Sequence, residues 1–445
     1  MVAVEKLKFD YKSLDDLKAD LQRFDLDLPI EEDVSILGEP INVGKRDLPN
    51  RIAIQPMEGC DALPDGSPGE LTFRRYERFA RGGAGLIWFE AVAVSELARG
   101  IDTQLWINEN TVDNFAKLVE ATRKAGIENN GVDPYLVIQL TFAGRYGKHK
   151  IIAVHEEEID RRSKVDPNKP VITDEELQAL EDDFVAAARL AKQAGFDAVD
   201  IKHCHRYLLS ELLGAHNRPG MYGGSYENRT RFLKNVINKI KAANIDIDIT
   251  MRLNSWDGIK YPYGWGCDEN GNPDLTEPKR LVKELYDMGM KMINISGSTP
   301  YLDPHMSRPY DQPSRFGYTP PEHPLIGVHR LLSLVKEIQQ AVPDMVVVGT
   351  GYSWLRQFAA QVGAGIVKEN WAKVIGFGRA AFAYPDLAND IIKQGQMQRN
   401  KVCITCSKCS DLKGNARLTG CVVRDNKVYV PPYLELMKDL DQQEA

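Results

Sequence analysis

No stretch of the sequence stays apolar for long enough to cross a membrane. A membrane-spanning helix needs roughly 20 consecutive apolar residues, and the most apolar run, Gly83–Val94, is interrupted by Glu90. The first residues, MVAVEKLKFDYKSLDDL, carry a charge every few positions and lack the apolar core of a secretory signal. We therefore expect a cytoplasmic protein without a membrane span.

The sequence also has no excess of positive charge and few cysteines. The formal net charge is -7 and the pI is about 5.8, which disfavours nucleic acid or an anionic membrane as the main partner. Of the seven cysteines, four lie between residues 403 and 421, unlike the spread of a secreted disulfide scaffold. This distribution indicates a reducing compartment.

Apolar, strand-like runs alternate eight times with helical patterns. The runs begin at Arg51, Gly85, Tyr135, Ala198, Ile247, Lys291, Met345 and Lys373. The clearest helix follows Thr173, which forms a capping box with Glu176, and its buried stripe is Leu180, Phe184, Ala187, Ala188 and Ala191. Eight such units predict an α/β fold, a (β/α)8 TIM barrel, with a doubly wound sheet as the alternative.

The barrel is expected to span residues 36–395. Residues 1–35 would form an N-terminal helical extension, which either caps the barrel or contacts a second copy in a homo-oligomer. Residues 396–445 would form a small appendage. The connections after the third to sixth strands are long, and the loops after strands hold seven of the eight histidines. In a β/α barrel these loops open on the carboxyl face, so we expect the active site there.

Four cysteines dominate the appendage. Cys403, Cys406, Cys409 and Cys421 have the spacing C-x2-C-x2-C-x11-C. Three closely spaced thiolates with a fourth returning from a loop are typical of a [4Fe-4S] cluster. A zinc site is the alternative, but zinc ribbons more often pair two C-x2-C motifs across a longer gap.

Several segments carry a resemblance to a known family. They are EPINVGKRDLPNRIAIQPMEG, IQLTFAGRYG, the run from ITDEEL to SELL, RPGMYGGSYENRTRF, VGTGYS and VIGFGRAAFAYPDL. Together they resemble the Old Yellow Enzyme superfamily, and most closely its iron-sulfur flavoproteins: 2,4-dienoyl-CoA reductase, 2-enoate reductases and trimethylamine dehydrogenase. PSRF, at residues 313–316, is similar to trimethylamine dehydrogenase in particular.

The resemblance implies that FMN lies across the barrel mouth. Motif positions matching the family's flavin-ring contacts are Pro56, Met57, Glu58 and Ala91, and those at its pyrimidine edge are Gln139 and Arg252. Positions matching the phosphate site are Gly351, Tyr352, Gly378 and Arg379. A cation at the pyrimidine edge would stabilise anionic reduced flavin, and barrels commonly bind phosphate after the last two strands.

The loop after the fourth strand matches the family's catalytic motif. The resemblance places Lys202 and His205 at the two positions that grip a substrate oxygen, and Tyr207 at the proton donor. FMN N5 would then give hydride to the β-carbon of an activated alkene while Tyr207 protonates the α-carbon. Lys202, Arg206 and Phe142 depart from the usual residues. The two added cations suggest an anionic substrate, with an outward-pointing Arg206 paired to an acidic neighbour as the alternative.

The expected reaction is reduction of a conjugated C=C bond in an enone, enoate or enoyl thioester. The alternatives are an amine dehydrogenase or demethylase that passes electrons out through the cluster, and a non-catalytic electron carrier. The sequence has no G-x-G-x-x-G after a strand. We therefore expect a redox partner such as a ferredoxin, a flavoprotein or a reductase subunit, with direct use of NAD(P)H as the other possibility.

Overall fold

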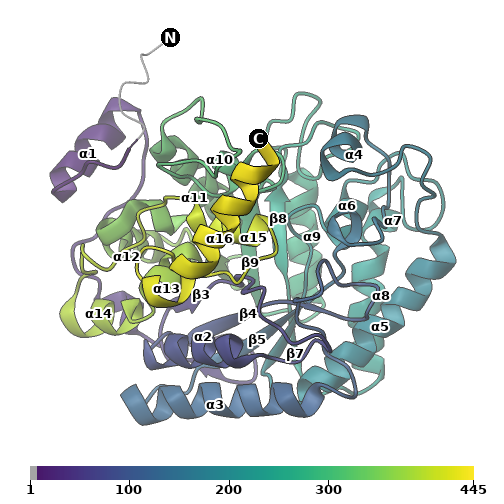
Figure 1. The fold of residues 1–445 in the computed structure, drawn as a ribbon, viewed down its shortest axis with the longest axis horizontal. Coiled ribbons are helices and arrows are strands. Elements are labelled where there is room, and N and C mark those ends of the chain that lie inside the picture. The colour runs from purple at the N-terminus through teal and green to yellow at the C-terminus, as the bar shows by residue number, and fades with distance from the viewer. Residues whose placement is uncertain (1–7, 445) are drawn as a thin grey trace.

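Nine parallel strand segments form a barrel in the computed structural model, which describes residues 8–444 (Figure 1). The strands are β3 (Ile52–Ile54), β4 (Leu86–Ala93), β5 (Tyr135–Thr141), β6 (Ala198–Ile201), β7 (Asp248–Thr250), β8 (Arg252–Trp256), β9 (Met292–Gly297), β10 (Val346–Gly349) and β11 (Val374–Phe377). Their hydrogen-bonded order is β7-β6-β5-β4-β3-β11-β10-β9-β8. Because β7 and β8 flank Met251 as two halves of one strand, the ring closes, and the predicted barrel is confirmed.

One long helix follows each barrel strand and covers its outer face. These helices are α2 (Glu70–Arg81), α3 (Val112–Asn130), α5 (Asp174–Gln193), α8 (Arg231–Ala242), α9 (Thr276–Asp287), α11 (Pro324–Ala341), α12 (Ala359–Lys368) and α14 (Leu387–Gln394). The predicted capping box of α5 is present: Glu176 N donates to Thr173 Oγ1 over 3.1 Å, and Thr173 N donates to Glu176 Oε2 over 2.7 Å.

The loops that follow the strands carry short helices. They are α4 (Glu157–Ser163), α6 (Leu208–Leu213), α7 (Tyr226–Arg229), α10 (Pro304–Ser307), α13 (Arg379–Ala383) and the 3-10 turns η2 (Gly144–Tyr146) and η3 (Tyr352–Phe358). The extension contains α1 (Leu14–Arg23), which buries Leu17 and Leu21, and η1 (Ser35–Gly38). Within residues 8–444, no helix combines the length and the apolar character that a bilayer crossing requires.

A hairpin closes the amino end of the barrel. Its strands are β1 (Ile41–Asn42) and β2 (Asp47–Leu48), which pair antiparallel. Val43 and Leu48 pack with inward-facing barrel residues such as Trp88. Side chains therefore fill the amino end of the barrel interior, and the barrel opens at its carboxyl face.

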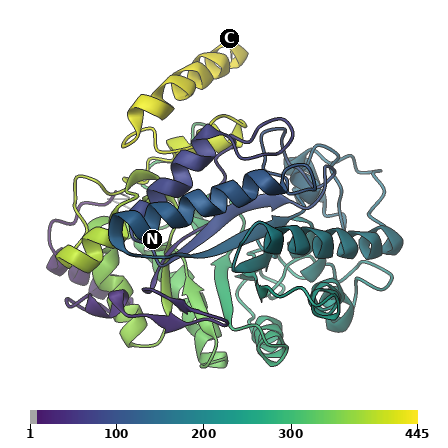
Figure 2. The ribbon, with the colours of Figure 1, turned by 90° about the horizontal axis from the view of Figure 1, so that it is seen from below.

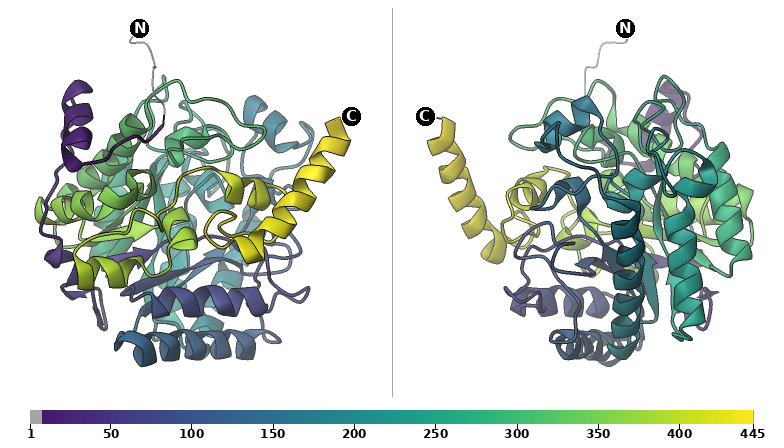
Figure 3. Two further views of the ribbon diagram at one scale, coloured as in Figure 1. Left: turned by 60° about the vertical axis from the view of Figure 1, so that its left-hand side comes forward. Right: turned by 90° about the vertical axis from the view of Figure 1, so that its right-hand side faces the viewer.

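The C-terminal appendage contains α15 (Lys408–Gly414) and α16 (Asn426–Glu444), which stands away from the barrel (Figures 2 and 3). Leu412, Val422, Tyr429, Leu436 and Leu440 give the appendage a small apolar core of its own. Polar contacts tie it to the barrel: Asp425 pairs with Arg74 and Arg78 of α2. The appendage therefore lies beside the first barrel loop.

Candidate active site at the carboxyl end of the barrel

A buried carboxylate organises the base of the candidate site. Asp200 Oδ2 accepts hydrogen bonds from Gln139 Nε2 over 2.6 Å and Trp88 Nε1 over 2.8 Å, and Asp200 Oδ1 accepts one from Arg252 N over 2.7 Å. Burial raises the pKa of Asp200 to about 6. These bonds fix the Gln139 amide. Sequence reasoning missed Asp200, although a carboxylate within an apolar strand was a visible signal.

Arg252 presents a partly buried guanidinium that pairs with no carboxylate in the described chain. Its Nη2 lies 3.4 Å from Ser296 Oγ, and its Nε has no hydrogen-bond partner among residues 8–444. Burial lowers the pKa of Arg252 below its usual range. An unpaired, partly buried cation of this kind fits an anionic or electron-rich ligand edge.

A second set of unpartnered donors follows the last two strands. The Tyr352 hydroxyl and Arg379 Nη1 are buried and have no partner within residues 8–444. Gly351 has φ +113°, a conformation that favours glycine, and a Cβ on Gly378 would lie 3.2 Å from Met57 Sδ. Unpaired donors beside a close-packed backbone fit a phosphate group.

The first loop brings further predicted flavin contacts to the same end. Pro56, Met57 and Glu58 follow β3 directly, and Ala91 lies opposite Gln139 in the β4–β5 pairing. The structure thus places the predicted cofactor positions of the first loop and of the last two strands at the carboxyl face, whereas Ala91, Gln139 and Arg252 lie within the barrel strands. Their assignment to FMN remains a prediction.

The predicted catalytic loop forms a tight turn between β6 and α6. His205 and Arg206 have φ of 63° and 61°, in the left-handed region that side chains rarely adopt. Lys202 Nζ lies 3.6 Å from the centroid of the Tyr207 ring, a cation–π contact. Burial, together with the cations of Arg252 and Lys202, holds the pKa of His205 well below its usual range, so the imidazole is neutral near pH 7.

The Tyr207 hydroxyl belongs to a closed ring of four polar groups. It lies 3.2 Å from Glu58 Oε1 and 3.0 Å from the Tyr301 hydroxyl. Lys413 Nζ lies 2.8 Å from the Tyr301 hydroxyl and 3.2 Å from Glu58 Oε2. Sequence reasoning missed Tyr301 and Lys413, because no local pattern links the loop after β9 to the appendage.

A cavity of about 320 Å³ opens beside this ring. Its lining includes Glu58, Tyr207, Tyr301 and Lys413, and also Lys150, Arg162 and Lys164. Glu58 is the single carboxylate among the described lining residues, and Lys413 pairs with it. The cavity therefore carries net positive charge.

Two predicted substrate residues do not line this cavity. The Arg206 guanidinium is fully buried, 3.6 Å from Asp257 Oδ2, and its Nη1 donates to Tyr263 O over 2.7 Å. Phe142 lies in the main apolar core, and its carbonyl accepts a hydrogen bond from Leu208 N. Their contact with substrate remains a prediction.

The four appendage cysteines border one common cavity, together with Arg379 and Phe382. Burial raises the pKa of Cys403, Cys409 and Cys421 to about 11 each. Among residues 8–444, no three or more His, Cys, Asp or Glu side chains converge closely enough to hold a single metal ion. The donor set of four thiols around a space fits a larger inorganic cluster.

A buried ion cluster supports the first loop from behind. Arg75 lies 2.5 Å from both Asp61 Oδ2 and Glu90 Oε1, and all three side chains are at most 4% exposed. Glu90 Oε2 accepts a hydrogen bond from Gly59 N over 2.8 Å, and Gly59 O accepts one from Thr419 N over 2.8 Å. The cluster thus links β4 and α2 to the loop between Cys409 and Cys421.

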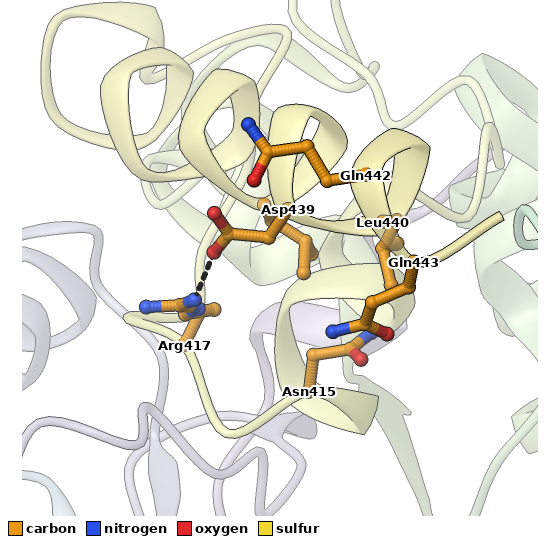
Figure 4. Close-up of a pocket in the computed structure, with 7 residues that line it drawn as sticks. Asn415, Arg417, Asp439, Leu440, Gln442 and Gln443 are labelled. Atoms are coloured by element: carbon orange, nitrogen blue, oxygen red, sulfur yellow. Dashed lines mark hydrogen bonds and ion pairs between the residues drawn. The ribbon is translucent and has the colours of Figure 1, made fainter. Parts of the chain in front are cut away.

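A further hollow of about 400 Å³ lies on the appendage surface (Figure 4). Arg417 and Asp439 form an ion pair there, and Asn415, Gln442 and Gln443 complete a polar lining. None of the predicted site residues lines it.

Comparison with known proteins agrees with this geometry. The sequence matches the "NADH:flavin oxidoreductase / NADH oxidase family" over residues 37–270. It is 35% identical to an NADPH dehydrogenase of Bacillus subtilis (strain 168), over 58% of this chain and 72% of that protein. It is 26% identical to a metal reductase of Desulforamulus reducens (strain ATCC BAA-1160 / DSM 100696 / MI-1), over 88% of this chain and 53% of that protein.

A solved structure supports the fold. That of 2-naphthoyl-CoA reductase with 2-naphthoyl-CoA superposes with a TM-score of 0.68 at 19% identity, over 88% of this chain and 57% of that one. The chain thus spans little more than half of the metal reductase and of this reductase. The family match covers more than half of the chain and, together with the barrel, identifies the protein as a member of the NADH:flavin oxidoreductase / NADH oxidase family, and thus as a flavin-dependent oxidoreductase.

Proposed function

We propose that the protein reduces a carbon–carbon double bond conjugated to an electron-withdrawing group, with Tyr207 as the proton donor. The observation that carries the proposal is a buried tyrosine hydroxyl on a cationic cavity at the carboxyl face. Burial, reinforced by Glu58, raises the pKa of Tyr207 well above its usual range. The hydroxyl therefore keeps its proton near neutral pH, as a general acid must.

The unpartnered donors at the barrel mouth fit FMN. Gln139 and Arg252 would hold the pyrimidine edge, and Arg379 with the backbone around Gly351 and Gly378 would hold the phosphate. When bound, FMN supplies the hydride. The family match and the names of the dehydrogenase relatives support FMN and a nicotinamide nucleotide as redox participants.

Lys202 and His205 would bind the oxygen of the electron-withdrawing group on the substrate. His205 is neutral, so it would donate a hydrogen bond, while Lys202 would contribute positive charge. Both would stabilise the negative charge that develops on that oxygen as the β-carbon is reduced. Tyr207 then transfers its proton to the α-carbon.

We further propose that the four appendage cysteines hold a [4Fe-4S] cluster. Their common cavity and their C-x2-C-x2-C-x11-C spacing support this assignment. A cluster there would pass single electrons between the FMN site and a redox partner such as a ferredoxin, a flavoprotein or a reductase subunit.

The charge of the cavity favours an anionic substrate. Lys150 and Lys164 line it, and neither has a carboxylate within ion-pair distance among residues 8–444. Positive charge of this kind attracts a carboxylate, or a thioester that carries phosphates, and repels a cationic amine. It therefore favours an enoate or enoyl thioester over the amine dehydrogenase alternative.

An anaerobic half-reaction tests the proposal. The protein is reduced with dithionite and mixed with cyclohexenone, cinnamate or crotonyl-CoA, and flavin reoxidation is followed by absorbance. Tyr207→Phe should slow reoxidation on the order of 10²–10⁴-fold, the usual contribution of a general acid. Tyr286→Phe, on outer helix α9, is the matched control. Reduction of the oxidised flavin by trimethylamine, with no response to any alkene, would contradict the proposal.

A further inference from the structure

We propose that Lys413 returns to Tyr207 the proton that each turnover consumes, through the hydroxyl of Tyr301. This inference rests on the proposed function, in which Tyr207 protonates the substrate. It gives the appendage a role in proton transfer, in addition to the cluster that its cysteines are proposed to hold.

The ring geometry gives a continuous path. The Lys413 ammonium is 2.8 Å from the Tyr301 hydroxyl, which is 3.0 Å from the Tyr207 hydroxyl. Both distances are within ordinary hydrogen-bond range. The ring of Tyr301 is held by stacking on Tyr146, with centroids 4.0 Å apart. The path is therefore short and its middle member is fixed.

The two ends of the path differ in their access to water. Tyr207 is 5% exposed, whereas the Lys413 side chain is 32% exposed and lines the cavity. Water can therefore reach the ammonium group more readily than the phenol. Lys413, like Tyr301 beside it, lines the cavity, and it is the end of the path that meets solvent.

The neighbouring groups exclude two other proton sources. Burial alone would raise the pKa of Glu58, but Lys413 and Lys202 hold it below its usual range, so Glu58 is a carboxylate without a proton to give. Lys202 Nζ lies over the face of the Tyr207 ring and forms a cation–π contact there. Glu58 thus accepts hydrogen bonds and keeps Lys413 charged.

The transfer conserves atoms and charge. As the new α-carbon–hydrogen bond forms, the O–H bond of Tyr207 breaks and leaves a phenolate. The phenolate takes the Tyr301 proton, Tyr301 takes one from the Lys413 ammonium, and the neutral amine takes one from water or buffer. The net result is one proton moved from solvent to substrate, with no change in any redox state.

Two substitutions separate proton transfer from packing. Lys413→Gln keeps a donor toward Tyr301 without an acidic ammonium group. Lys413→Arg keeps the charge, but guanidinium does not deprotonate in proteins. Lys427→Gln, an exposed position at the start of α16, is the control within the appendage.

The assay counts turnovers with cyclohexenone as the probe and reduced methyl viologen as the electron source. In the first turnover, from pre-reduced protein, both Lys413 variants should match the native rate, because Tyr207 already carries its proton. Later turnovers should slow on the order of 100-fold. In Lys413→Ala, small primary amines should restore later turnovers, more strongly as the amine becomes more acidic.

Three results would overturn the relay: native-like later turnovers in both Lys413 variants, an equally slow first turnover, or rescue that does not depend on amine acidity. A native protein whose flavin no alkene reoxidises would overturn the proposed function, and the relay with it. Native turnover with unaffected Lys413 variants would remove the relay alone.

Discussion

The ion cluster of Arg75, Asp61 and Glu90 should stabilise the folded protein and hold the loop after β3 in place. In Arg75→Met, the carboxylates of Asp61 and Glu90 would remain buried, at most 4% exposed, without their shared cation. Breaking a buried pair by removing one partner costs about 3–5 kcal/mol. Because Glu90 also holds Gly59 N, the loop that carries Glu58 should loosen as well.

Urea unfolding at a fixed concentration of added FMN measures the change. The free energy of unfolding should fall by about 3–5 kcal/mol, and the flavin and iron contents should fall together. Arg81→Met is the control, because the Arg81–Glu77 pair is exposed and such pairs contribute about 0.2–1 kcal/mol. Adding Glu90→Gln to Arg75→Met should recover part of the loss. A loss below about 1 kcal/mol, equal to that of the control, would refute the reasoning.

Other perturbations have equally defined outcomes. Burial raises the pKa of Asp200 from 3.8 to about 6. Between these two pH values the Asp200 carboxyl is protonated in the folded protein but ionised in the unfolded chain. The free energy of unfolding should therefore fall by about 3 kcal/mol as the pH rises through this window. Urea titrations from pH 3 to pH 8 should show this slope, Asp200→Asn should remove it, and flavin affinity should fall because Gln139 loses its anchor. Lys164→Glu reverses one charge at the cavity, so it should raise the KM for crotonyl-CoA roughly tenfold at low salt. The KM for the neutral cyclohexenone should not change. Equal increases in the two KM values would contradict an anionic substrate site. Cys406→Ser should lower the iron content in a colorimetric assay, and retention of native iron would remove the cluster assignment.

Periodicity was sufficient to predict the barrel. Short runs such as the one at Met345 are apolar on both faces, as strands covered by helices must be, and β10 forms there. The interruption at Met251 was not predicted, because β7 and β8 read as one continuous run. The sequence also carries no sign that Asp200 anchors Gln139, since that contact spans 61 residues.

The resemblance supplied the catalytic turn, but not its surroundings. Tyr207 was assigned from a local motif that survives in the sequence. Tyr301 follows β9 and Lys413 lies in α15, 94 and 206 residues further along the chain, and only the folded protein brings their polar atoms together. The charge of Arg206 left two roles open in the sequence, a substrate contact or a pair with an acidic neighbour, and the fold places its Nη1 3.6 Å from Asp257 Oδ2.

The β1–β2 hairpin leaves one end of the barrel open to ligands. With the amino end filled by Val43 and Leu48, the proposed cofactor, substrate and product would all enter and leave at the opposite end, beside the appendage. A protein that delivered electrons to the proposed cluster would have to dock near that same end. A donor that lingered after its delivery would delay product exit, so rapid departure of the donor becomes a condition for fast turnover.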